Sequence, residues 1–226
     1  MRRLLALGLL VCAMTAVQAE GAVIVTSDKV TFLTSTGATS ATGPLPDLGT
    51  ATPQPVTVGS ITFSSPPPST VVIGVAGHGI LDWTTLLPGN DIAINAVENL
   101  NMVSAAPVFA MGFDFVEPAL GGSTTDTCFV AICTDSTFAV TVKNGSTIIH
   151  AFTFNAADDV AAFVGVWSSD AFDRLEIREL NNTIDDEFWG QVYTGDRPLP
   201  AVPAPMTLAL LGAGLAGLGL MRRCAR

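Results

Sequence analysis

Hydrophobic and polar positions alternate with a period of two along most of the body of this 226-residue chain. The alternating runs are rich in β-branched and aromatic residues, and they predict strands over residues 56–63, 71–75, 109–115, 160–167, 174–178 and 188–193. Clusters of Gly, Pro and Ser separate these runs, notably over 43–55 and 64–69. We find no long amphipathic helix pattern and no internal repeat inside the body.

The clearest local feature is a predicted hairpin. Residues 138–143 alternate, Asn144-Gly145 follows, and a second run extends over 146–154. Asn-Gly favours the two positive φ angles of a type I′ turn. Many short strands separated by turns indicate an all-β fold, and we expect a single jelly-roll-like β-sandwich rather than an immunoglobulin-like one.

The N-terminus differs from this body. It combines two arginines, an apolar run over residues 4–11 and small residues before Glu20. This is the pattern of a secretory signal peptide over residues 1–19, cleaved between Ala19 and Glu20. A lipoprotein signal would use Cys12, but Val11 stands where that signal has a small residue.

The C-terminus predicts a membrane segment. Residues 206–221 carry no formal charge, and Arg222, Arg223 and Arg226 follow them. A buried C-terminal helix is the alternative, because sixteen residues reach only about 24 Å as a helix. The segment is apolar all round and contains four glycines, which suit a membrane helix better than a soluble one. We therefore expect a transmembrane helix whose basic end stays in the cytoplasm.

The sequence Val202-Pro203-Ala204-Pro205 precedes this apolar span and its arginine cluster. The three-part arrangement resembles the bacterial PEP-CTERM sorting signal, a tail also known as the ice-binding protein C-terminal domain. The family pattern has Glu where this chain has Ala204. The resemblance implies processing by an exosortase-type membrane protease, transient anchoring in the inner membrane through the C-terminal helix, and delivery to the cell surface or the extracellular polysaccharide layer.

The chain therefore divides into four predicted segments. They are a signal peptide (1–19), a β-sandwich domain (20–195), a proline-rich linker with the sorting motif (196–205) and the transmembrane helix with its basic tail (206–226). We expect the linker to be semi-extended and to hold the sandwich away from the membrane.

The net charge of the predicted domain limits the classes of ligand that it can bind. Residues 20–195 contain nineteen acidic and four basic side chains, a formal balance of −15. A field of this sign disfavours nucleic acid and anionic lipid as ligands of the domain. It is compatible with divalent cations, with neutral polysaccharide, or with a soluble acidic surface that binds nothing.

Two of the four cysteines lie in the predicted domain, because Cys12 belongs to the signal peptide and Cys224 to the basic tail. Cys128 and Cys133 would lie in an oxidising compartment, where disulfides persist. We predict one bridge between them, closing a small loop and contributing on the order of 2 kcal/mol. Their spacing is not Cys-x-x-Cys, and the two histidines of the chain, His78 and His150, offer no metal-ligand pattern with them.

The densest acidic cluster, Asp185-Asp186-Glu187, precedes a predicted strand. Carboxylates in a sandwich loop can hold a structural Ca²⁺, with Asp173 as a further ligand and Glu176 or Asp114 as alternatives. The simpler interpretation is a solvated acidic turn. No other cofactor is expected.

Aromatic residues are candidates for contact with a sugar. Trp83 is the tryptophan most suited to a position near a loop, whereas Trp167 and Trp189 fit the core better. Short motifs over residues 105–195, such as Met-Gly-Phe-Asp-Phe ending at Phe115, resemble exported bacterial sandwich domains similar in outline to galactose-binding jelly rolls. This second resemblance implies a fold and leaves the ligand open.

The sequence favours a non-enzymatic protein. It contains no Gly-x-Ser-x-Gly and no His-Glu-x-x-His motif, and among nineteen acids a glycosidase pair would leave no local trace. We predict an exported structural or adhesive protein of the polysaccharide layer. The alternatives are a carbohydrate-binding module, with or without calcium, and a secreted glycoside hydrolase.

Overall fold

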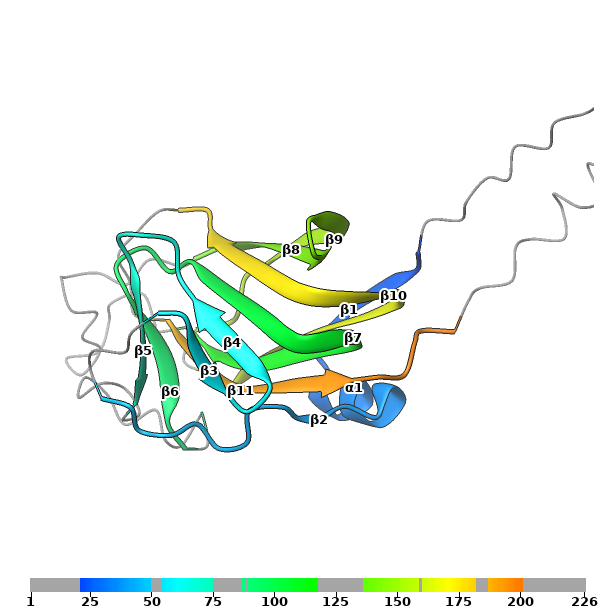
Figure 1. Ribbon diagram of the computed structural model, residues 1–226, viewed down its shortest axis with the longest axis horizontal. Coiled ribbons are helices and arrows are strands. Elements are labelled where there is room, and N and C mark those ends of the chain that lie inside the picture. Colours follow the sequence, from blue (N-terminus) through cyan, green and yellow to red (C-terminus); the bar gives the residue numbers. More distant parts are fainter. Residues whose placement is uncertain are drawn as a thin grey trace, which may run out of the picture.

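The computed structural model describes residues 21–49, 54–74, 87, 89–117, 136–158, 160–181 and 187–200. The described part is almost entirely β, with one short helix (Figure 1). Its elements are β1 (Val23–Thr26), α1 (Lys29–Thr36), β2 (Thr39–Ser40), β3 (Val56–Val58), β4 (Ile61–Ser64), β5 (Thr70–Gly74), β6 (Asp91–Asn95), β7 (Leu100–Val116), β8 (Phe138–Asn144), β9 (Thr147–Phe154), β10 (Ala162–Glu179) and β11 (Phe188–Gly195).

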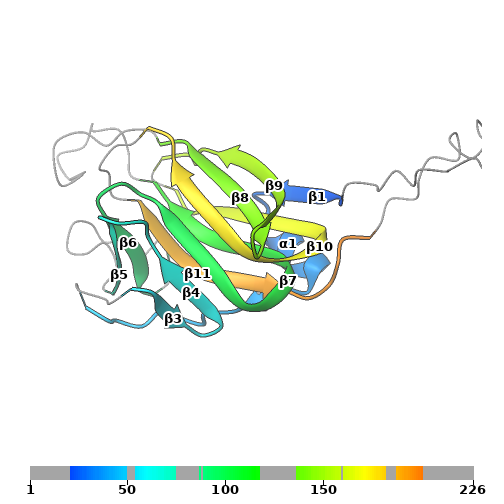
Figure 2. The same ribbon diagram turned by 45° about the horizontal axis from the view of Figure 1, so that its top comes forward.

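The strands form two packed layers, so the predicted all-β sandwich is confirmed (Figure 2). The first layer runs β5-β6-β11-β7-β10-β1, and the second runs β3-β4-β7-β10-β8-β9. β7 and β10 belong to both layers because each is long enough to pass from one to the other. Every pairing is antiparallel.

The passage between layers occurs where pairing of β7 with β10 is irregular. Their register shifts on both sides of the Phe172–Val108 pair. In β7 the segment from Ala105 to Pro107 is exposed, and Pro107 has no N–H to donate to a ladder. Bulges bend a strand locally, so the same two strands supply a wall of each layer. The separate strands predicted over 160–167 and 174–178 are therefore one strand.

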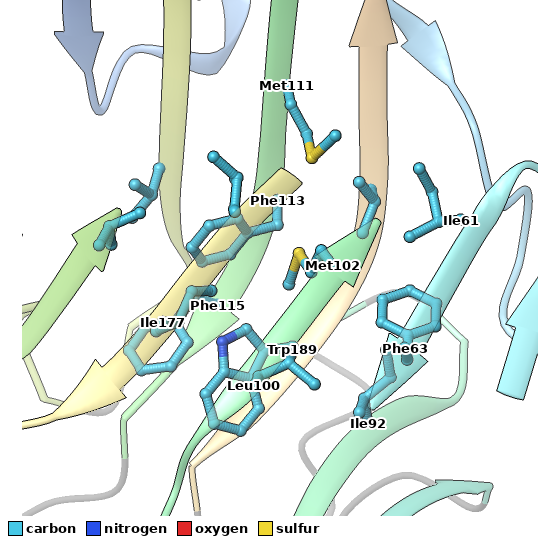
Figure 3. Packing of buried hydrophobic residues seen from close by; sticks show 14 of the residues in the cluster. Ile61, Phe63, Ile92, Leu100, Met102, Met111, Phe113, Phe115, Ile177 and Trp189 are labelled. Carbon is cyan, nitrogen blue, oxygen red and sulfur yellow. The ribbon is translucent and has the colours of Figure 1, made fainter. Parts of the chain in front are cut away.

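The core fills the space between the layers. Inward-facing residues of β7 and β11, among them Met111, Phe113, Phe115 and Trp189, meet Met102 and others from the second layer (Figure 3). Trp189 is fully buried against Phe115, with ring centroids 5.5 Å apart, which confirms its predicted core position.

The predicted hairpin is present, but its turn lies one residue later. Asn144 ends β8 and pairs with Thr147, so Gly145 and Ser146 form the loop. Gly145 has a positive φ of 58°, whereas Asn144 does not. The predicted type I′ turn is therefore wrong. A positive φ at the first central residue alone is the requirement of type II′.

The predicted strand over 56–63 is likewise a hairpin, formed by β3 and β4 around Gly59 and Ser60. Gly59 has a φ of 58°, and a Cβ there would lie 2.1 Å from the carbonyl oxygen of Ala41. Glycine is required at this position both for the turn and for the close approach of the neighbouring backbone.

The sequence pattern does not predict the strands β1, β2 and β6, nor helix α1. Asp28 caps its N-terminus by accepting a 3.0 Å hydrogen bond from the Thr31 N–H, and Gly37 ends it with a φ of 68°. Phe32 points from α1 onto the outer face of the first layer, where it packs against Phe163 at a centroid distance of 5.2 Å.

The chain leaves the body beside the point where it enters. The Leu199 N–H donates to the Ser168 carbonyl and the Ser169 N–H to the Ala22 carbonyl, both at 2.9 Å. Leu199 is buried, and Trp167 Nε1 donates to the Arg197 carbonyl at 2.8 Å. The first residues of the predicted linker thus pack against β10 instead of standing free.

Residues 206–221 lie outside the described part, as do residues 1–19. Within the described ranges, no helix has both the length and the apolar character that a membrane crossing requires. The signal peptide and the transmembrane helix remain predictions from the sequence.

Candidate functional site

The outer face of the first layer carries a buried ion pair. In β7, Ala110, Gly112, Asp114 and Val116 alternate with the inward-facing core residues, and Asp114 is the one charged residue among them. Asp114 is 6% exposed. A carboxylate this deep needs hydrogen-bonding or charged partners, and α1 supplies one.

Lys29 is the first residue of α1, and the capped start of the helix places it over Asp114. Its Nζ lies 2.7 Å from Oδ1 and 2.9 Å from Oδ2 of Asp114. The same ammonium donates to the Tyr193 hydroxyl at 2.8 Å, and this hydroxyl donates to Asp114 Oδ2 at 2.9 Å. The three side chains form a closed hydrogen-bonded triangle from α1, β7 and β11.

The triangle shifts two pKa values. Partial burial lowers the pKa of Lys29, but the hydrogen bonds to Asp114 and Tyr193 outweigh it, so the pKa lies above its ordinary value. Burial raises the pKa of Tyr193; the hydrogen bond from Lys29 opposes this rise and the charge of Asp114 adds to it. At neutral pH the site therefore holds an ammonium and a neutral phenol.

A cavity of about 590 Å³ opens beside this triangle. Lys29 and Asp114 lie on one side, and the segment between β9 and β10 lies on the other. The remaining lining is mostly apolar and is contributed by Ser27, Phe154, Asn155, Ala156, Ala157, Val160, Ala161, Ala162, Phe163 and Val164. This volume and this mixture of apolar walls with few polar groups are typical of small-molecule sites.

The hydrogen-bond count of the triangle restricts what the cavity can bind. An ammonium has three donors, and Lys29 directs all three at Asp114 and Tyr193. A carboxylate has about four acceptor positions, of which Asp114 uses three. The site therefore has acceptor capacity left on Oδ1 and no ammonium donor left for an anion.

The predicted calcium ligands are not brought together as a set. Asp173 lies at the bend of β10, where its carboxylate accepts from the Gly145 N–H at 3.1 Å. Glu187 is buried and precedes Phe188, which pairs with Val116 at the far end of β7. Asp185 and Asp186 lie outside the described residues.

The two alternative ligands have cationic partners already. Asp114 is paired with Lys29, and Glu176 with Lys143. Across the described ranges, no three His, Cys, Asp or Glu side chains are grouped so as to hold a metal ion.

Other buried carboxylates hold loop segments in place. Glu117 accepts a short hydrogen bond from the Ser136 N–H. Glu179 accepts from the Ser136 hydroxyl at 3.4 Å and from the Glu98 N–H at 3.2 Å. Part of the acidic composition therefore serves the fold, since carboxylates can satisfy buried backbone donors.

The remaining predicted residues divide by location. Trp167 is partly buried on the outer face of the first layer, next to the cluster around Phe32. Outside the described residues lie Trp83, His78, Cys128 and Cys133, Ala19 and Glu20, and the sorting residues Val202, Pro203, Ala204, Pro205, Arg222 and Arg223. Their predicted roles stay predictions.

The sequence does not predict the triangle, because Lys29 carries no signal of a site and Tyr193 counts only among the aromatic candidates for contact with a sugar. Asp114 was considered only as a calcium ligand, and the group beside it is an ammonium. The three residues are 79 to 164 positions apart in the chain. A lone Lys or Tyr on a strand or helix carries no local signal of such a contact. The one available hint is a charged residue, Asp114, inside the otherwise apolar predicted strand over 109–115.

Neither a family model nor a curated protein sequence matches this chain. Among solved structures it is similar to a variant of a family 29 carbohydrate-binding module, with a TM-score of 0.40 and 12% identity over 74% of this chain and 99% of the other. A family 11 carbohydrate-binding module from Clostridium thermocellum, in complex with a mixed-linked tetrasaccharide, gives 0.34 and 9% over 64% and 93%. Similarity this low assigns neither a ligand nor a site.

Proposed function

We propose that this protein is an exported, non-catalytic module whose cavity binds a neutral sugar unit of an extracellular polysaccharide. The observation that carries the proposal is the cavity beside Asp114, where one carboxylate oxygen keeps acceptor capacity while every donor of Lys29 is engaged. A ligand suited to this wall donates hydrogen bonds and carries no negative charge. Sugar hydroxyls meet both conditions.

The apolar walls agree with this ligand class. Phe154, Phe163 and Val160 face the cavity with a run of alanines, and the C–H faces of a sugar ring offer matching apolar surface. Ser27 and Asn155 add polar atoms at the lining. Ligand pockets commonly combine a few polar groups, which orient the ligand, with apolar lining.

Binding is favoured over hydrolysis by the composition of the lining. Hydrolysis of a glycosidic bond generally needs two carboxyl groups flanking it. Among the described residues that line the cavity, Asp114 is the one carboxylate, and Lys29 and Tyr193 hold it. We therefore propose a carbohydrate-binding role in preference to a glycoside hydrolase.

The export route is proposed from the two ends of the sequence. A signal peptide over 1–19 would bring the chain out of the cytoplasm. The tail over 202–226, similar to a PEP-CTERM signal, would hold it in the inner membrane until an exosortase-type protease acts. Mass spectrometry of the protein from its host should show loss of residues 1–19 and cleavage near 202–205. An intact tail would contradict the sorting proposal.

The binding proposal is tested by a glycan array and by titration calorimetry on the full-length protein. Val160 lies at the cavity and is 46% exposed, so Val160→Trp should fill the space and lower affinity at least tenfold without disturbing the triangle. Leu180→Trp is the matched control, since Leu180 is 56% exposed and does not line the cavity. Equal loss in both variants, or none in either, would contradict the cavity as the site.

Calcium gives a second check. Lys29 takes the position beside Asp114 that a cation would otherwise occupy, so binding in the cavity should be the same with Ca²⁺ and with EDTA. Abolition by EDTA would instead point to the acidic segment around residues 185–187.

A further inference from the structure

The few basic residues of the body are concentrated on one face. Residues 20–195 contain four Lys and Arg side chains, and all but Lys29 lie on the outer face of the second layer. These three, Lys143, Arg174 and Arg178, surround Glu176. We call this group the basic strip. Its formal charge is +2 in a body whose balance is −15.

Strand register aligns the basic strip with polar residues of neighbouring strands. One transverse row crosses five strands through Thr57, Thr62, Val103, Arg174 and Lys143. The next row contains Ser64, Asn101, Glu176 and Thr141. Strands lie about 4.8 Å apart, so the first row spans roughly 19 Å. It has two hydroxyl side chains at one end, Val103 in the middle and two cationic side chains at the other end.

Within the strip, Arg174 has fewer close polar contacts than the other two cations. Lys143 Nζ lies 2.7 Å from Glu176 Oε2. Arg178 donates to the Ile177 carbonyl at 2.7 Å and to Asn101 Oδ1 at 2.6 Å, so it is tied to its own sheet. Arg174 has only a 3.7 Å approach of Nη1 to Glu176 Oε1. Its buried Nε has no hydrogen-bond partner among the described residues.

Glu176 cannot neutralise three cations. Burial raises its pKa, but the hydrogen bond from Lys143 and the positive charges around it lower the pKa overall, so it stays ionised and still carries only one charge. An arginine presents a planar fork of donors that fits a carboxylate with two parallel hydrogen bonds. The side chain of Arg174 is 35% exposed, and its contact with Glu176 is a 3.7 Å approach, so most of its N–H donors are available to a ligand.

We propose that the basic strip is a second binding surface, which takes an acidic polysaccharide through the carboxylates of its uronic acid units. Arg174 holds a carboxylate, Lys143 adds charge beside it, and the rows of Thr, Ser and Asn accept and donate hydrogen bonds to the sugar hydroxyls. This site goes beyond the cavity, which excludes anions. With the cavity on the first layer and the strip on the second, one protein would contact two polysaccharide chains at once.

Nucleic acid fits the strip less well. Proteins that bind duplex DNA commonly neutralise six or more phosphates, whereas the strip offers three cations around one carboxylate. A densely charged polymer would also extend into the acidic field of the rest of the body. A uronic acid chain carries carboxylates among neutral hydroxyls, and the strip has cations on β8 and β10 with Thr, Ser and Asn side chains on the neighbouring strands.

The test is binding of the full-length protein to polygalacturonate, with dextran as the neutral polymer and duplex DNA as the polyphosphate. Arg174→Gln should weaken binding to polygalacturonate about tenfold, as expected for loss of a bidentate charge-assisted contact, and Lys143→Gln should weaken it less. Arg197→Gln is the matched control. It removes the same charge from a residue outside the basic strip, where the guanidinium donates to the Ser35 carbonyl. Binding should weaken steeply as salt is added.

Equal affinity of wild type and Arg174→Gln for polygalacturonate would overturn the proposal, as would tighter binding to DNA than to polygalacturonate. Val160→Trp separates the two proposals. It should remove neutral-glycan binding at the cavity and leave polygalacturonate binding intact, so either site can fail while the other stands.

Discussion

Lys29 Nζ and Asp114 Oδ1 lie 2.7 Å apart although 85 positions of chain separate the two residues. This contact fixes the start of α1 onto the C-terminal end of β7, and Tyr193 closes it from β11. The polar wall of the cavity is thus built on a helix and two strands, which hold side chains more precisely than a loop does. The geometry that we propose for recognition of a sugar hydroxyl is therefore part of the packing of the sandwich.

The first prediction concerns Tyr193, the single tyrosine of the chain, whose ionisation can be followed by ultraviolet absorbance. Its pKa should lie above the ordinary value of about 10 in the folded protein and return to that value in urea. Lys29→Met should raise the pKa of Tyr193 further, because Lys29 lowers it, and Asp114→Asn should lower it. Shifts of the same sign in both variants would contradict the triangle.

The same groups make stability depend on pH at the alkaline end. Lys29 and Tyr193 both have raised pKa values in the fold, so their contribution is complete below the ordinary values of about 10 and is lost as pH rises through the folded ones. The free energy of unfolding, measured in urea, should fall above about pH 10. The fall should be shallower in Lys29→Met.

Much of the fold could be predicted because strand patterning is local. The hairpin of β8 and β9, the strand β5 and the strand β11 follow from alternation and glycine placement. By contrast, the pattern divides β10 in two, because its middle, from Ser168 to Ala171, is polar or small and resembles a loop. Pairing with β7 and β1 holds that segment in the sheet.

Helix α1 could not be predicted from its own residues. It contains three threonines and a serine in eight residues, and threonine has low helix propensity. The cap at Asp28 and the burial of Phe32 and Thr36 stabilise it, and those contacts depend on the sheet. Tertiary packing outweighs helix propensity here. The triangle cannot be predicted either, because it depends on the position of Lys29 at the start of this helix.

The net charge of the body does not show where its basic residues lie. A count of nineteen acids against four bases disfavours anionic ligands, but it says nothing of where the bases lie. Buried acids such as Glu98 and Glu117 add to the count without adding to the surface. The basic strip depends on the strand register, which places Lys143 beside Arg174.

The second prediction concerns the contact of α1 with β10. A Cβ at Gly165 would lie 2.7 Å from Cδ2 of Phe32 and 2.8 Å from Cε1 of Phe163. Gly165→Ala should therefore lower the free energy of unfolding by about 1–3 kcal/mol through overpacking. In a Phe32→Leu background the same change should cost less, because the smaller side chain makes room. Denaturation curves of the four proteins measure this difference, and equal costs in both backgrounds would argue against the contact.

The third prediction concerns where the stable body ends. Leu199 is 8% exposed and its N–H is bonded to β10. Leu199→Ala should lower the free energy of unfolding by about 2 kcal/mol, whereas Pro198→Ala, at an exposed neighbour, should change it by less than about 0.5 kcal/mol. If both variants melt at the temperature of the wild type, the segment is a free linker after all. Confirmation would place any processing at 202–205 within a few residues of the packed surface.

The fourth prediction concerns Cys128 and Cys133, which lie outside the described residues. A bridge closing so short a loop acts mainly by restricting the unfolded chain, and it contributes on the order of 2 kcal/mol. Cys128→Ser should lower the melting temperature of the protein, and Cys133→Ser should lower it by the same amount, since either change removes the same bridge. The double variant should be no less stable than the single ones, because nothing further is lost. Two free thiols from this pair in the untreated secreted protein would refute the bridge. Unequal effects of the two substitutions would mean that the cysteines stabilise the fold separately.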